Sequence, residues 1–285
     1  MFEKVNPQHP DKVADRIAGA IVDIAYKRDQ SPKIAVEVLL GHNKALVMIE
    51  TNINITEHDV VDTVWRIAGN MQVEVRIVAQ DYILAGNQQG GLRCGDNGIF
   101  KGCVPTDEQK VLTALANDIY TKHPHDGKYL INESNITVCQ SHASTVHLRD
   151  EVSAFAQKCL SNPSRLNLHI NPLGDWTGGP NVDCGATNRK LGSDMGDGVT
   201  GGGLHGKDLS KADVSVNIWC FLEACRTGRE QTAICSIGDE RVNGVPYSEV
   251  VFRAQQYINS IGGFEKFAEW GLIRPATAIK EPRNR

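Results

Sequence analysis

Residues 171 to 215 carry the side chains with the clearest chemistry in this chain. Glycine recurs through the stretch, with four lysines or arginines and six aspartates between the glycines. Glycine lets a backbone approach a ligand closely, lysine and arginine attract phosphate, and aspartate can hold a Mg²⁺ ion that bridges to phosphate oxygens. Long glycine-rich loops inside compact domains are usually functional. We interpret the stretch, here called the phosphate cradle, as a site for a polyphosphate with Mg²⁺; the alternative is a solvated, flexible loop.

Within the cradle, residues 201–207 have the G-x-x-x-x-G-K spacing of a P-loop. The next residue is Asp208, where a P-loop has the Ser or Thr that binds Mg²⁺. The preceding residues are polar and glycine-rich, whereas a P-loop follows a buried strand. The sequence therefore argues against a P-loop NTPase. If a helix begins near Ser210, Lys211 and Asp213 lie in its first turn near Lys207, where a helix N-terminus favours phosphate.

Two further places in the sequence could contribute polar chemistry. His9-Pro10-Asp11-Lys12 precedes a helical pattern over residues 12–28, so Asp11 is either an ordinary N-cap or part of an anion or metal corner. Glu37 interrupts the first strand of a β-hairpin predicted over residues 33–54. The residue pattern of the strand favours a position on the solvent face for Glu37. The alternative is a buried carboxylate with a functional role.

Both helices and strands must position these residues, which predicts an α+β fold. A helix–hairpin–helix–strand unit could recur in it, and residues 80–102 form a second candidate functional loop. We predict further helices over 56–70, 106–122, 149–160, 212–227 and 248–260, and strands over 72–79, 135–140, 166–170 and 231–237.

Composition limits the class of protein. The chain has 285 residues, 41% of them hydrophobic, and a net charge of −4. It can bury a full core, has no basic bias toward nucleic acid, and has no apolar run of transmembrane length. No two of the eight cysteines form a C-x-x-C pair. The N-terminus lacks the apolar core of a signal peptide. We therefore expect free thiols in the cytoplasm and no nucleic-acid or membrane partner.

Five blocks together resemble the S-adenosylmethionine synthetase (methionine adenosyltransferase) family. They occur in the family's order and span most of the chain. The blocks are His9-Pro10-Asp11-Lys12; Val36-Glu37 with Met48-Ile49-Glu50-Thr51; Gly95-Asp96-Asn97-Gly98; Asn171-Pro172 through Arg189-Lys190; and Gly201-Gly202-Gly203 through Asp213.

The resemblance implies roles for individual residues. The triphosphate would be contacted by His9, Lys128, Arg189, Lys190, Lys207 and Lys211. Asp11 and Asp213 would hold Mg²⁺, and Glu37 matches a glutamate associated with K⁺. Substrate contacts would come from Glu50 and Gln80 for methionine, from Asp96 and Asp183 for adenosine or methionine, and from Trp176, which replaces an adenine-stacking Phe and keeps the π-face.

The resemblance also implies the reaction and the architecture. ATP and L-methionine would give S-adenosylmethionine, with the triphosphate cleaved to phosphate and pyrophosphate. Three related βαβ-type subdomains would surround a pseudo-threefold, with sheets packed at the subunit interface of a homodimer or dimer of dimers. Approximate subdomains are 1–104, 105–225 and 226–285. A non-catalytic ATP-binding paralogue, or another ATP–Mg²⁺ kinase or ligase, is the alternative function.

The chain departs from the family pattern in several places. The loop between Gln80 and Asp96, the middle region and the part after Ile237 are shorter than the family's. In the cradle, the family's A-F-S is replaced by Leu204-His205. The residues expected to bind triphosphate and Mg²⁺ are the best preserved.

Overall fold

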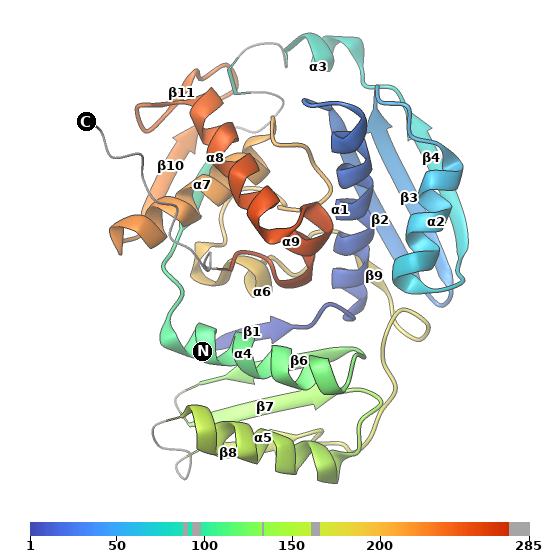
Figure 1. The fold of residues 1–285 in the computed structure, drawn as a ribbon, viewed down its shortest axis with the longest axis vertical. Coiled ribbons are helices and arrows are strands. Elements are labelled where there is room, and N and C mark those ends of the chain that lie inside the picture. The colour runs from blue at the N-terminus through green and yellow to red at the C-terminus, as the bar shows by residue number, and fades with distance from the viewer. Residues whose placement is uncertain (88–90, 93–97, 133, 161–165, 274–285) are drawn as a thin grey trace.

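The computed structural model describes residues 1–87, 91–92, 98–132, 134–160 and 166–273 (Figure 1). The predicted site residue Asp96 lies outside these ranges. No helix of the described part is long and apolar enough to cross a membrane.

The first structural unit is a helix–hairpin–helix–strand arrangement. Strands β2 and β3 pair antiparallel, and β4 then pairs parallel with β3. The sheet order is β4-β3-β2-β9, so the edge beside β2 comes from the cradle. The elements are α1 (Pro10–Arg28), β2 (Ile34–Gly41), β3 (Lys44–Thr51), α2 (Glu57–Ala68), β4 (Gln72–Val78) and β9 (Gly185–Ala186).

A second unit repeats this arrangement and confirms the predicted recurrence. Its hairpin strands β6 and β7 are antiparallel, and β8 is parallel to β7. The edge strand β1, from the start of the chain, pairs antiparallel with β6. The elements are β1 (Phe2–Val5), α4 (Asp107–Lys122), β6 (Gly127–Ile131), β7 (Asn135–Gln140), α5 (Thr145–Cys159) and β8 (Asn167–Ile170).

The third unit is smaller. Its two-stranded sheet pairs β5 with β10, and a short hairpin joins β11 to β12. Helix α9 lies against α1, on the side opposite the β2–β4 sheet (Figure 1). The elements are β5 (Gly98–Gly102), α7 (Ala212–Thr227), β10 (Gln231–Cys235), β11 (Arg241–Val242), β12 (Val245–Pro246), α8 (Tyr247–Ile261) and α9 (Phe264–Trp270).

Helix α1 is the centre of the largest core cluster. Its apolar positions Val13, Ile17 and Ile21 are fully buried, because β2 covers one face of the helix and α9 another. Thr56 begins α2 as a complete capping box with Asp59, as its sequence predicts. Two short helices, α3 (Tyr82–Asn87) and α6 (Leu191–Met195), lie in segments that the sequence predicts as loops. The predicted α+β fold is confirmed.

Candidate active site

The first group of site residues surrounds the N-terminus of α1. The N-cap is His9, whose Nδ1 accepts a hydrogen bond from the backbone N–H of Asp11 at 3.2 Å. The Asp11 carboxylate is therefore not the cap but faces the cradle. It accepts from the Ala186 N–H at 2.9 Å and pairs with Lys190 Nζ at 2.5 Å and Arg189 Nη1 at 3.5 Å. The structure thus shows that Asp11 is not the N-cap and that its carboxylate lies among the cations of the cradle.

Strand β9 sets this contact, because it places the cradle directly against α1. Gly185 packs so closely that a Cβ there would lie 2.1 Å from the Pro10 carbonyl carbon. Only glycine allows this approach, which brings the Ala186 N–H within reach of Asp11.

Burial shapes the electrostatics of this group. Burial, followed by the nearby positive charge of Lys190, lowers the pKa of His9 to about 4. His9 is therefore neutral at pH 7 and offers hydrogen bonds without charge.

Asp126 is a member of this region that the sequence analysis missed. Its Oδ2 accepts from the Gly179 N–H at 3.1 Å, and burial raises the pKa of its carboxyl to about 6. Asp11, Asp183 and Lys190 also influence this pKa, so Asp126 belongs to the same electrostatic environment. Its proximity to Lys128, in an Asp-x-Lys sequence, was the available signal.

The second group lies at the N-terminus of α7. Lys207 Nζ pairs with Asp213 Oδ2, and Asp213 Oδ1 accepts from the Gly202 N–H at 3.0 Å. A Cβ at Gly202 would lie 2.3 Å from the same carboxylate, so a larger residue there would displace the Asp213 side chain. The predicted proximity of Lys207 and Asp213 is confirmed. Lys211 is buried, with its Nζ 2.8 Å from Asp208 Oδ2 and 3.2 Å from the Ile34 carbonyl oxygen.

The remaining predicted residues occupy separate positions around these groups. Glu37 lies on the solvent face of β2, as its pattern predicts, and accepts a hydrogen bond from Thr187. Glu50 is half-buried on β3, and Gln80 is buried. Lys128 Nζ pairs with Glu3 at 2.9 Å. Asp183 is exposed, and its Oδ1 accepts from the Cys184 N–H at 2.7 Å.

Trp176 is held on two sides. Its Nε1–H donates to Asn171 Oδ1 at 3.2 Å, and its carbonyl oxygen accepts from the His142 N–H at 3.0 Å. These bonds fix the segment that presents the indole beside Gly178, where a Cβ would lie 2.6 Å from the ring.

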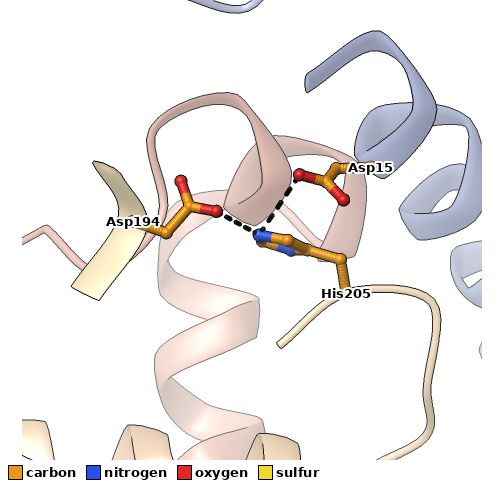
Figure 2. Close-up of side chains that lie close together, drawn as sticks. All are labelled: Asp15, Asp194 and His205. Atoms are coloured by element: carbon orange, nitrogen blue, oxygen red, sulfur yellow. Dashed lines mark hydrogen bonds and ion pairs between the residues drawn. The ribbon is translucent and has the colours of Figure 1, made fainter. Parts of the chain in front are cut away.

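A third polar group joins two cradle residues to helix α1. Asp15, Asp194 and His205 are all buried and point toward one another, with candidate ligand atoms within 4.8 Å of each other (Figure 2). Nothing in the sequence pattern links these three residues, because they lie on three segments that only the fold brings together.

Comparison with known proteins shows which proteins this chain resembles. The model of the family "S-adenosylmethionine synthetase, N-terminal domain" matches residues 1–84. The S-adenosylmethionine synthase of Parvibaculum lavamentivorans is 29% identical over 271 residues, covering 75% of this chain and 68% of the relative. That of Hyphomonas neptunium is also 29% identical, covering 75% and 69%. In sequence, this chain is similar to S-adenosylmethionine synthetases.

The overall fold is also similar to that of a solved structure. A solved structure described as an unusual S-adenosylmethionine synthetase from Campylobacter jejuni matches with a TM-score of 0.74. It is 21% identical, and the match covers 96% of this chain and 95% of that one. The two chains therefore share their fold over nearly their whole length.

Proposed function

We propose that this chain is a methionine adenosyltransferase, which makes S-adenosylmethionine from ATP and L-methionine. The triphosphate is then cleaved to phosphate and pyrophosphate. The observation that carries the proposal is the pairing of Asp11 with Lys190 and of Asp213 with Lys207, at two helix N-termini. These residues are the ones that the family pattern assigns to triphosphate and Mg²⁺.

The residue types suit a displacement at carbon. The methionine sulfur already has a nucleophilic lone pair, so no general base is needed when it attacks C5′ of ATP. The protein must align the reactants and stabilise charge on the departing triphosphate. Arg189, Lys190 and Lys207 supply positive charge, and neutral His9 supplies a hydrogen bond. Lys128 and Lys211 are assigned to the triphosphate by family pattern alone.

The carboxylates of Asp11 and Asp213 fit Mg²⁺, which prefers hard oxygen ligands. Each carboxylate is next to a lysine, so on binding the lysines can pair with phosphate and the carboxylates with Mg²⁺ in place of the internal pairs. Bound Mg²⁺ would neutralise charge on the triphosphate. We propose that Glu37 supplies one oxygen ligand of a K⁺ site. Such a site needs further oxygen ligands.

Substrate contacts follow the family pattern, with one addition. We propose that Trp176 stacks on adenine and that Asp183 and Asp96 contact adenosine or methionine. Glu50 and Gln80 are proposed to contact methionine. Buried Asp126 joins them as a hydrogen-bonding carboxyl near the adenosine.

We propose that the enzyme is a homodimer, or a dimer of dimers, with active sites between subunits. The outer face of the β2–β4 sheet supports this, because it presents the exposed apolar side chains Leu39, Leu46 and Met48 beside Glu37 and Glu50. A shared interface would bring these glutamates next to a partner subunit. Free thiols such as Cys103, Cys139 and Cys220 favour a reducing compartment, the cytoplasm.

The test is product analysis after the purified chain is incubated with ATP, L-methionine, Mg²⁺ and K⁺. We expect S-adenosylmethionine with phosphate and pyrophosphate, detected by mass spectrometry. ADP or AMP would instead indicate a kinase or ligase. Unchanged ATP that remains bound would indicate a non-catalytic paralogue.

A further inference from the structure

The buried Asp15–Asp194–His205 group has the composition of a metal site, but a lysine occupies its centre. Lys12 Nζ lies 2.8 and 2.7 Å from the two carboxylate oxygens of Asp194. It lies 3.1 Å from Asp15 Oδ2 and 3.3 Å from His205 Nε2. The ammonium thus contacts every side chain that would ligate an ion.

The charges of this group balance without a metal ion. Lys12 and Lys4, which also interacts electrostatically with Asp194, offset the carboxylates of Asp15 and Asp194 when the imidazole is neutral. Burial raises the pKa of Asp194, and Lys12 and His205 lower it by more, so that it stays ionised. A divalent cation would add two uncompensated positive charges in a buried place unless Lys12 left.

His205 connects this group to the cradle. Its Nε2 lies 2.8 Å from Asp194 Oδ2 and 3.8 Å from Asp15 Oδ2 (Figure 2). Because a carboxylate can only accept, the imidazole donates its Nε2–H to Asp194. The ring also packs on Phe267 of α9, with centroids 5.2 Å apart.

The backbone of His205 is held at the same time by Asn188. The Asn188 side chain accepts from the His205 N–H at 2.9 Å and donates to its carbonyl oxygen at 3.1 Å. The Asn188 N–H in turn donates to Asp15 Oδ1 at 2.7 Å. One closed network therefore fixes the segment before Arg189 and Lys190 and the segment before Lys207.

We propose that His205 is a positioning residue for the phosphate cradle, held in a network whose central cation is the Lys12 ammonium and not a metal ion. The proposal rests on the proposed function in one respect, that the cradle binds triphosphate. It extends beyond the family pattern, which has no histidine at this place.

The test compares His205→Phe with His205→Gln. Phenylalanine keeps an aromatic ring against Phe267 but cannot donate to Asp194, whereas glutamine keeps an N–H donor. The exposed His58, whose side chain is 84% accessible, gives the control variant His58→Gln. The measurement is the affinity for Mg²⁺ with inorganic tripolyphosphate by isothermal titration calorimetry, alongside the melting temperature.

We expect His205→Phe to bind tripolyphosphate at least tenfold more weakly, with a melting temperature within a few degrees of wild type. His205→Gln should recover to within about threefold of wild type, and His58→Gln should match it. Equal affinities for wild type and His205→Phe would overturn the proposal, as would a wild type that binds no tripolyphosphate. If His205→Phe does not fold, the affinity of His205→Gln decides. A tenfold weaker binding of tripolyphosphate by folded His205→Gln would overturn the proposal, because this variant retains an N–H donor and should still position the cradle.

The metal content of the same proteins tests the second half of the proposal. After exposure to Mn²⁺ and Zn²⁺ and removal of free ions, wild type and His205→Phe should carry equal amounts of metal. One equivalent per chain in wild type that is lost in His205→Phe would overturn the assignment of Lys12. These outcomes are distinct from failure of the proposed function, which would be absence of S-adenosylmethionine while tripolyphosphate still binds.

Discussion

At the scale of single residues, the site consists of opposite charges that neutralise one another. Asp11 pairs with Lys190 and Arg189, and Asp213 pairs with Lys207. This arrangement keeps cations and carboxylates together before any ligand supplies charge of its own. The sequence singled out these residues by their types, their spacing and the family resemblance. It could not identify Asp126 or His205, whose roles depend on burial and on neighbours far along the chain.

Lys207→Ala should remove charge stabilisation of the leaving triphosphate. We expect kcat to fall at least about a hundredfold, the usual scale for losing one preorganised charged or hydrogen-bonding group. The melting temperature should fall as well, because the largely buried Asp213 carboxylate loses its ion-pair partner, so turnover is measured well below that temperature. The matched control is Lys101→Ala, which breaks an ion pair of 2.8 Å with Glu230 outside the cradle. Near-normal turnover by Lys207→Ala would show that the role assigned to this lysine is wrong.

Asp126 should make stability depend on pH. Its pKa is raised from 3.8 to about 6 in the folded chain, so the folded state holds this proton more tightly than the unfolded state. The free energy of unfolding should therefore fall as pH rises from about 4 to about 6, by up to roughly 3 kcal/mol.

Asp126→Asn keeps an acceptor for the Gly179 N–H and cannot ionise. Chemical denaturation at pH 4, 5, 6 and 7 should show a smaller loss of stability with rising pH in Asp126→Asn than in wild type. Parallel curves for the two proteins would mean that Asp126 titrates normally in the fold.

At the scale of elements, the longest helices and the strands of the hairpin were predictable from local pattern. Helix α1, the β2–β3 hairpin and α2 follow from apolar periodicity and from the Thr56 cap. The short edge strands β1 and β9 were not predicted. Each contains at most four residues and gains its pairing from a distant segment, so local sequence carries little signal for it.

The close approach of β9 to α1 predicts a strong effect of a small substitution. Gly185→Ala would place a Cβ 2.1 Å from Pro10, so either the strand or the helix must move. We expect a loss of several kcal/mol in unfolding free energy, as for severe overpacking. Gly192→Ala in α6 is the control, because a Cβ there meets nothing within 4 Å.

Thermal denaturation of the two variants gives a direct comparison. Gly192→Ala should melt at or slightly above the wild-type temperature, because alanine favours a helix over glycine. Similar melting temperatures for Gly185→Ala and wild type would contradict the packing described for β9.

At the scale of the whole molecule, one face of the β2–β4 sheet exposes large apolar side chains. On the outer face of the β2–β4 sheet, Leu39 is 54% exposed and Met48 is 45% exposed. We expect light scattering to give about twice the chain mass of 31.2 kDa, or a multiple of that.

Met48→Glu should shift this mass toward the monomer, because a charge would be buried at the interface. Phe252→Glu is the control, since Phe252 is 59% exposed on α8, away from this sheet. Dissociation by both variants, or by neither, would argue against the proposed interface.

The central claim is that the C5′–O bond of ATP breaks, and not a P–O bond. The most direct measurement uses ATP carrying ¹⁸O at the 5′ bridging oxygen, with L-methionine, followed by mass spectrometry of all products. The account predicts S-adenosylmethionine without ¹⁸O, and the label in the phosphates derived from triphosphate. A nucleoside product that retains ¹⁸O on C5′, such as ADP or AMP, would contradict adenosyl transfer and leave phosphoryl or adenylyl transfer as the chemistry of this cradle.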